Sequence, residues 1–331
     1  MSNNNLVKRF TQQAGIELPV VCGAMYPCSN PELVAAVSNA GGLGIIQPIS
    51  LTYVHGYDFR EGIRFMRRLT EKPLGMNALI ERSSKKYHEK MVQWVEIALE
   101  EGVRFFVTSL GKPDWVVERV HAANGFVYHD VTERRWALKG MDADVDGFIA
   151  VNNRAGGHAG QKSAPQLYEE LSEFGLPILC AGGISTAEDL KLALQLGYAG
   201  VQLGTRFIAS QECTASDAYK NAIIKASEAD IVLSERITGV PVSVINTPYI
   251  ERTGTRVGPL AKWMLKGELS KRWVRTFYAL KSLWQLKKSN NDQSGSLDYW
   301  QAGKSVSGIH EILPVAEIMK AFRTQVKLYG E

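Results

Sequence analysis

The stretch Gly147-Phe148-Ile149-Ala150-Val151-Asn152-Asn153-Arg154-Ala155-Gly156-Gly157-His158-Ala159-Gly160 decides how the rest of the chain is interpreted. Its first five residues form a short apolar run, which is typical of a buried strand in a parallel sheet. Its last five residues hold three glycines, which let a backbone approach a flat ligand, and one histidine, which exchanges a proton near neutral pH. The stretch predicts a strand that delivers a catalytic loop, although an ordinary exposed loop would have the same residues.

Seven further apolar runs alternate with longer amphipathic stretches along the first two thirds of the chain. Together the eight runs lie at residues 19–25, 42–46, 73–78, 104–109, 126–131, 147–151, 177–181 and 200–203. Short strands alternating with helices indicate an α/β fold, and eight such units predict a (β/α)8 TIM barrel. A doubly wound sheet is disfavoured, because no Gly-x-Gly-x-x-Gly follows the first strand.

After Phe207 the pattern becomes mostly helical. We therefore predict a barrel over residues 1–210 and a C-terminal helical lid or subdomain over residues 211–331 that packs on it. Residues 262–288 carry eight basic side chains against one acidic side chain. We expect the apolar face of this helix to pack on the barrel; an anionic membrane surface or an acidic protein partner are the alternatives. That apolar face consists of Trp273, Phe277, Leu280 and Trp284.

Composition excludes several classes of protein. Of the 331 residues, 45% are hydrophobic and 22% are charged, which is ordinary for a globular protein. The net charge is +4, and the segment 262–288 supplies more than all of it, so the main body does not indicate nucleic-acid binding. No leader and no long apolar run is present, so we expect a cytoplasmic protein without stable membrane insertion. The four cysteines lack metal-ligand spacing and are expected to be buried thiols, with no metal site.

Two small turns follow the seventh and eighth predicted strands. They are Ala181-Gly182-Gly183-Ile184 and Gly204-Thr205-Arg206-Phe207. In a (β/α)8 barrel the active site lies at the carboxyl ends of the strands, and a phosphate often sits between these two loops. Backbone N–H groups and a hydroxyl predict a cradle for one terminal phosphate, ahead of a helix that Ser185 and Glu188 would cap. Two ordinary tight turns are the alternative.

The other predicted strand ends carry small or uncharged side chains. Gly23, Ala24 and Met25 end the first strand, Gln47 follows the second, and Asn77 ends the third. None is a lysine suited to a Schiff base or part of a carboxylate pair for enolisation, as sugar-phosphate chemistry would need. Flat, uncharged surroundings favour the isoalloxazine ring of FMN, with His158 as the acid–base group.

These motifs together resemble the nitronate monooxygenase family, formerly called 2-nitropropane dioxygenases. The resemblance rests on residues 37–44, 155–160, 181–184 and 204–207, and it extends through residues 234–239 and 299–303. It implies an FMN-dependent oxidoreductase that uses dioxygen to oxidise alkyl nitronates, or nitroalkanes after proton removal, to carbonyl compounds and nitrite.

The resemblance also implies roles for individual residues. His158 would face the substrate and act as the base. The expected partners are the small-molecule substrate and dioxygen, and a homodimer is left open. The residues expected to bind FMN are Gly23, Ala24, Met25, Asn77, Gly157, Ala181, Gly182, Gly183, Gln202, Gly204 and Thr205.

Two positions depart from the family pattern, and two other functions stay open. Arg154 stands where the family usually has an acidic residue, and Lys304 where relatives commonly have glutamine, so we expect an altered substrate charge preference and pocket edge. The scaffold also resembles NAD(P)H-dependent flavin reductases of the enoyl-acyl-carrier-protein reductase and quinone reductase types. A flavin- or phosphate-binding protein without catalysis is the third interpretation.

Overall fold

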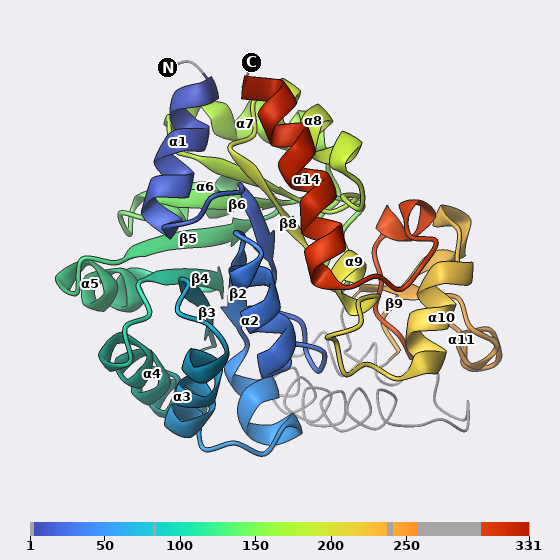
Figure 1. Cartoon of the computed structure of the whole chain (residues 1–331), viewed down its shortest axis with the longest axis horizontal. Coiled ribbons are helices and arrows are strands. Elements are labelled where there is room, and N and C mark those ends of the chain that lie inside the picture. Colours follow the sequence, from blue (N-terminus) through green and yellow to red (C-terminus); the bar gives the residue numbers. More distant parts are fainter. Residues whose placement is uncertain (1–2, 82–83, 237–240, 257–298, 331) are drawn as a thin grey trace.

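A computed structural model of the chain describes residues 3–81, 84–236, 241–256 and 299–330. Eight parallel strands follow one another around a closed barrel, and β8 pairs with β1 (Figure 1). The strands are β1 (Val20–Cys22), β2 (Leu43–Ile46), β3 (Leu74–Ile80), β4 (Phe105–Leu110), β5 (Phe126–Val131), β6 (Gly147–Val151), β7 (Ile178–Ala181) and β8 (Gly200–Leu203). The predicted (β/α)8 barrel is confirmed, and each strand overlaps its predicted run.

Helices lie on the outside of the barrel between successive strands, and one further helix precedes the first strand (Figure 1). They are α1 (Asn3–Ala14), α2 (Pro31–Asn39), the π-helix η1 (Ser50–Val54), α3 (Phe59–Leu69), α4 (Lys85–Glu100), α5 (Asp114–Ala122), α6 (Arg134–Met141), α7 (Ala164–Leu171), the 3-10 helix η2 (Ser172–Phe174) and α8 (Ala187–Leu196). The helix α2 begins with Pro31 at its first position, as predicted, because that position needs no backbone N–H.

The start of α8 differs by one residue from the prediction. The N-cap is Thr186, whose hydroxyl accepts a hydrogen bond from Asp189 N at 3.2 Å while the Asp189 carboxylate accepts one from Thr186 N at 2.9 Å. The predicted pair, Ser185 and Glu188, was wrong, although Ser185 also donates to the Asp189 carboxylate. Both pairs fit the same sequence pattern, and only the backbone conformation decides between them.

Side chains from alternate positions of the strands fill the inside of the barrel. They are Val21, Leu43, Ile45, Phe105, Val107, Tyr128, Ile149, Leu179 and Ala181. Phe10 of α1 packs against the rings of Phe105 and Tyr128, with centroid distances of 6.1 and 5.6 Å. The interior is therefore a packed core covered by α1, and ligands are left with the carboxyl-terminal mouth of the barrel.

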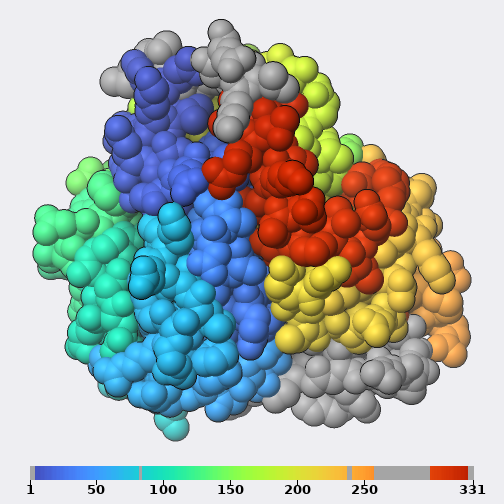
Figure 2. Space-filling model, viewed as in Figure 1, coloured from blue at the N-terminus to red at the C-terminus, as the bar shows by residue number. Residues whose placement is uncertain are grey.

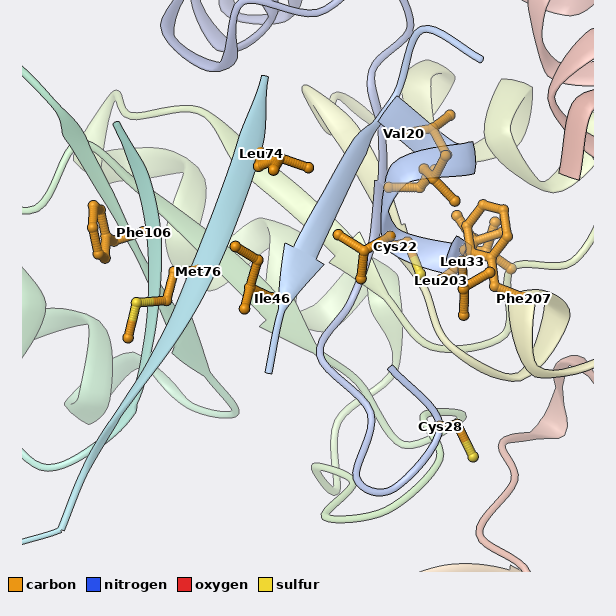
Figure 3. Packing of buried hydrophobic residues seen from close by; sticks show 14 of the residues in the cluster. Val20, Cys22, Cys28, Leu33, Ile46, Leu74, Met76, Phe106, Leu203 and Phe207 are labelled. Carbon is orange, nitrogen blue, oxygen red and sulfur yellow. The ribbon is translucent and has the colours of Figure 1, made fainter. Parts of the chain in front are cut away.

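A second apolar layer lies between the strands and the helices. Figure 3 shows Val20 of β1 and Leu203 of β8 in this layer, together with Leu33 of α2 and Phe207. The four cysteines are buried free thiols, as predicted, and they are Cys22, Cys28, Cys180 and Cys213.

The chain beyond β8 forms a mixed subdomain and a final helix. Its described elements are α9 (Thr205–Ile208), α10 (Asp217–Lys225), the 3-10 helix η3 (Glu228–Asp230), β9 (Ile231–Ser234), β10 (Val242–Ile245), α11 (Pro248–Thr253), the 3-10 helix η4 (Lys304–Gly308) and α14 (Val315–Gly330). The strands β9 and β10 form an antiparallel pair that the prediction of a mostly helical extension did not include. The predicted basic helix at residues 262–288 lies outside the described residues.

The final helix α14 packs on the barrel next to α2 and α8, and Figure 2 shows it in red beside the blue α2. A Cβ on Gly42, just before β2, would come within 2.7 Å of the methyl group of Met319. Arg323 pairs with Glu17 at 2.7 Å. The end of the chain thus packs on the outer ring of the barrel, and the predicted boundary at residue 210 stays a prediction.

Among the described residues, no helix is both long and apolar enough to cross a membrane. In the same part of the chain, no group of three or more histidine, cysteine or acidic side chains is placed to hold a metal ion.

Candidate active site

The loop after β6 carries His158 and is held from two sides. At its start, Asn152 Nδ2 donates to the Gly182 carbonyl at 2.9 Å, and Asn152 Oδ1 accepts from Arg154 N at 2.8 Å. Further along, Gly157 and Ser243 of β10 exchange backbone hydrogen bonds of 2.7 and 3.4 Å. The loop therefore connects the turn after β7 to the subdomain.

His158 lies exposed at this loop, and no described hydrogen bond joins its ring to another residue. The protein atoms around the ring still lower its pKa below the usual value, because they displace water that stabilises the charged form. A neutral, accessible imidazole can accept a proton from a ligand near neutral pH. The structure thus gives His158 the properties of a base, and its catalytic role stays a prediction.

The turn after β7 packs tightly against the loop that carries His158. Gly182 and Gly183 have φ angles of +115° and +81°, a region that favours glycine. A Cβ on Gly182 would come within 2.6 Å of Ala155 N, and one on Gly183 within 2.6 Å of Arg154 Nε. Both glycines are therefore required by backbone conformation and by the close approach of the neighbouring loop.

The turn after β8 lies beside the loop after β1. A Cβ on Gly204 would come within 3.3 Å of Met25 Sδ. The Thr205 hydroxyl accepts a hydrogen bond from Gly303 N at 3.0 Å and keeps its own proton available for a ligand. The glycines predicted to hold a phosphate thus follow two adjacent strands.

We call the place where β1 pairs with β8 the β1–β8 seam. One buried polar atom at this seam has no hydrogen-bond partner among the described residues. A Cβ on Gly23 would come within 2.9 Å of Gln202 Cδ, so the Gln202 side chain lies directly over Gly23. Within the described residues, the buried Gln202 Oε1 accepts no hydrogen bond. Leaving a buried carbonyl oxygen unsatisfied costs free energy. A ligand with an N–H group at this seam would remove that cost, and the polar edge of an isoalloxazine ring has such a group.

The sequence suggested that Asn77 ends its strand. In the structure Asn77 lies within β3. The ladder continues to Ile80, which pairs with Leu110 because β4 is equally long. Asn77 pairs laterally with Val107 of the barrel interior, so its side chain shares that inward face. No described hydrogen bond involves the Asn77 carboxamide.

The predicted cofactor residues fall into two groups, and Asn77 is apart from both. Those at the β1–β8 seam are Gly23, Met25, Gln202, Gly204 and Thr205. Those at the β6–β7 edge are Gly157, Ala181, Gly182 and Gly183. No described side-chain contact joins Asn77 to either group, whereas Ala24, between Gly23 and Met25 in the chain, packs against the interior cluster that includes Ala181. Their roles in holding FMN stay predictions.

Sequence analysis expected Arg154 to influence the substrate charge preference. In the structure Arg154 lies beside the predicted phosphate turn. Its guanidinium makes two hydrogen bonds of 2.8 and 2.9 Å with the Glu228 carboxylate, and Lys304 Nζ lies 3.4 Å from Glu228 Oε1. A bidentate pair of this kind fixes the plane of the guanidinium. Glu228 was missed because it is remote in sequence and sits in no motif.

A second residue that sequence analysis missed is Asp130, near the end of β5. Tyr128 of the same strand faces the barrel interior, and side chains alternate along a strand, so Asp130 shares that face. The sequence contained a signal for this residue: side chains alternate along the predicted strand at residues 126–131, and that alternation puts the Asp130 carboxylate on the inward face.

Comparisons with known proteins agree with this geometry. A model of the nitronate monooxygenase family matches residues 8–324. A dehydrogenase of (3aS,4S,5R,7aS)-5-hydroxy-7a-methyl-1-oxo-octahydro-1H-indene-4-carboxyl-CoA from Rhodococcus jostii is 29% identical over 76% of this chain and 70% of its own. A probable nitronate monooxygenase from Staphylococcus aureus is 27% identical over 79% of this chain and 84% of its own. The structure of FabK from Thermotoga maritima superposes with a TM-score of 0.78 at 28% identity, over 97% of this chain and 98% of that one.

Proposed function

Because this chain belongs to the nitronate monooxygenase family, a family of flavin-dependent oxidoreductases, we propose that it oxidises alkyl nitronates, or nitroalkanes after proton removal, with FMN and dioxygen. The observation that carries the proposal is His158, a neutral and accessible base on a loop that packs against the predicted phosphate turn. Bound FMN would accept electrons from the nitronate and return them to dioxygen, with a carbonyl compound and nitrite as products.

The residues at the barrel mouth fit a flavin. Gly182, Gly183 and Gly204 offer backbone N–H groups to the phosphate, and Thr205 offers its hydroxyl. The unpartnered Gln202 oxygen would accept a hydrogen bond from the ring edge. We also place Arg154 at the phosphate, because Glu228 holds its guanidinium against Gly183.

His158 would remove the Cα proton of a nitroalkane. The proton passes to the imidazole, and the electron pair of the C–H bond moves into the nitro group, which gives the nitronate. A lowered pKa keeps the imidazole neutral and ready to accept that proton at neutral pH. With a nitronate as substrate this step is unnecessary, so His158 matters most for neutral nitroalkanes.

An NAD(P)H-dependent flavin reductase is the second candidate. The relative from Rhodococcus jostii is named a dehydrogenase of a carboxyl-CoA thioester, which supports a thioester as an alternative substrate class. In that case the same residues would hold a flavin, whose chemistry would be hydride transfer from the nicotinamide to the substrate.

Anaerobic mixing separates the two candidates. The purified flavoprotein is mixed with propyl-2-nitronate and, separately, with NADH or NADPH, while the flavin absorbance is followed. Reduction by the nitronate alone supports the proposed function, and reduction by NADH or NADPH alone overturns it in favour of the reductase. If the protein is colourless and gains no flavin spectrum with added FMN, the cofactor assignment fails.

A further inference from the structure

Asp130 places a carboxyl group on the inner face of the barrel near its mouth. Its Cα partner on β6 is Ile149, and two residues earlier Tyr128 belongs to the same interior cluster. The loop of His158 returns to this strand end, because a Cβ on Gly160 would come within 3.3 Å of Thr132 Cβ. Asp130 and the loop of His158 therefore lie on the same side of the barrel mouth.

The described side chains that share the inner face with Asp130 on β4 and β6 supply no cation. Within the described residues, its Oδ1 is shielded from water and has no hydrogen-bond partner. The neighbouring strands have no ionisable side chain on their inner faces, which carry Phe105, Val107 and Ser109 on β4 and Gly147, Ile149 and Val151 on β6. The adjacent loop carries Arg154, which pairs with Glu228, Lys162, which pairs with Glu170, and His158, which has no described hydrogen bond.

Most charged side chains on the helices packed on β5 form ion pairs with residues other than Asp130. These helices, α5 and α6, lie on the outer face of the strand, where His129 contacts the Thr108 hydroxyl at 2.9 Å. Their ion pairs are Arg119–Glu96, His121–Asp146, Arg134–Glu173 and Arg135–Glu133. Asp114, Glu118 and Lys139 are the other charged side chains on these two helices.

A carboxyl group in such surroundings is more stable with its proton. The ionised form loses hydration at Oδ1 and gains no cation or donor there from the described residues. Burial accordingly raises the pKa of Asp130 to about 7, while it lowers that of His158. Below about pH 7 the mouth therefore holds an uncharged acid that can donate, beside a histidine whose lowered pKa favours the neutral form that can accept.

We propose that Asp130 is a neutral carboxylic acid whose O–H donates a hydrogen bond to an oxygen of an anionic ligand at the barrel mouth. The ligand class, a nitronate, rests on the proposed function. An ionised carboxylate at this position would repel a nitronate, whereas the neutral acid stabilises its negative oxygen. Asp130 thus selects the anionic form of the ligand, and it loses this ability when the pH rises through its own titration.

Infrared spectroscopy tests the protonation state without turnover. The holoenzyme should show the carbonyl stretch of a protonated carboxyl group, which disappears in Asp130→Asn and titrates in the wild type near pH 7. Asp142→Asn, at an exposed carboxylate after α6, is the matched control and should leave the band unchanged. A wild-type spectrum without this band overturns the proposal, and so does a band that persists in Asp130→Asn. If Asp130→Asn fails to fold, the pH titration of the carbonyl band in the wild type is the deciding measurement.

Nitrate, a planar anion shaped like the nitro group of a nitronate, tests the interaction with the ligand. Its dissociation constant is measured by perturbation of the flavin spectrum between about pH 6 and 8.5. Nitrate should bind the wild type about tenfold more weakly at the upper pH, and the affinity for Asp130→Asn should not change with pH. An unchanged wild-type affinity, or the same pH dependence in Asp130→Asn, overturns the proposal.

The two proposals fail separately. If the band and the nitrate titration behave as expected but propyl-2-nitronate does not reduce the flavin, the nitronate assignment fails and the neutral acid stands. If nitronate is oxidised but the band is missing, the role of Asp130 fails and the function stands.

Discussion

The backbones of Gly156 and Gly303 are in close contact. A Cβ on Gly303 would come within 2.7 Å of Gly156 N, and a Cβ on Gly156 within 2.9 Å of Gly303 N. Next to this contact, Lys304 N donates to the Arg154 carbonyl at 2.9 Å, and Gly303 N donates to Thr205. One segment of the subdomain thus holds both the loop of His158 and the predicted phosphate turn.

Substitution of Gly156 by Ala should disturb this contact. The added methyl group meets backbone atoms that cannot move away easily, so we expect a loss of stability of about 1–3 kcal/mol and weaker FMN binding. Gly175→Ala is the control: its φ of +67° costs about 1 kcal/mol, but no atom lies within 4 Å of the new Cβ, and FMN affinity should not change. Equal effects of both variants on FMN affinity would contradict this interpretation of Gly156.

Replacement of His158 by Asn should reduce turnover of a neutral nitroalkane by about 10²–10⁴-fold while FMN stays bound. Because the His158 pKa is lowered, the wild-type kcat/KM should fall on the acid side only below the usual pKa of histidine. His310→Asn, at an exposed histidine, should leave both measurements unchanged. Wild-type turnover in His158→Asn would remove this residue from catalysis.

Arg154→Ala should weaken FMN binding and leave riboflavin binding unchanged. Riboflavin lacks the phosphate, so the difference isolates the interaction of the guanidinium with that group. Loss of one charge-assisted contact predicts an FMN dissociation constant about tenfold higher or more, measured by quenching of flavin fluorescence. Glu228→Gln should act in the same direction, since Glu228 orients Arg154. An equal loss for FMN and riboflavin would place Arg154 away from the phosphate.

Asp130→Asn should stabilise the fold at high pH relative to the wild type. The pKa of Asp130 is raised from 3.8 to about 7, so the wild type is favoured while the acid is protonated and loses stability as pH rises from about 4 to 7. The stability advantage of the variant should grow over that range to at most about 4 kcal/mol and then stay constant. Urea unfolding at several pH values measures it, and an advantage that does not vary with pH would show that Asp130 has an ordinary pKa.

Phe322→Ala should destabilise the whole barrel. Phe322 is buried on α14 among residues that pack on α2 and α8, and truncation of a buried phenylalanine costs about 3–5 kcal/mol. Lys320→Ala on the exposed side of the same helix should change stability by less than about 0.5 kcal/mol. A single unfolding transition at a lower midpoint would support α14 as part of the barrel. A separate early transition, with the barrel midpoint unchanged, would show that the extension folds on its own.

The corrections to the sequence-based picture have two causes, an ambiguous local pattern and contacts between remote residues. The Ser185–Glu188 cap was one residue early, because two overlapping pairs fit one pattern. The strands β9 and β10 were not predicted, because each is only four residues long and gains its stability from pairing with the other. Glu228 was missed as a site residue for the same reason, and the contact of Gly303 with Gly156 was not predicted, since no local pattern shows what either residue contacts.

The sequence by itself determined the barrel, the order of its strands and the loop that carries His158. Local hydrophobic periodicity and glycine position encode these features, and both are read from neighbouring residues. Only the tertiary structure decided that Glu228 holds Arg154 against Gly183, that Gly303 closes on Gly156, and that Asp130 Oδ1 has no hydrogen-bond partner among the described residues. Each of these depends on the burial and spacing of groups brought together by chain closure, and those quantities exist only in the folded molecule.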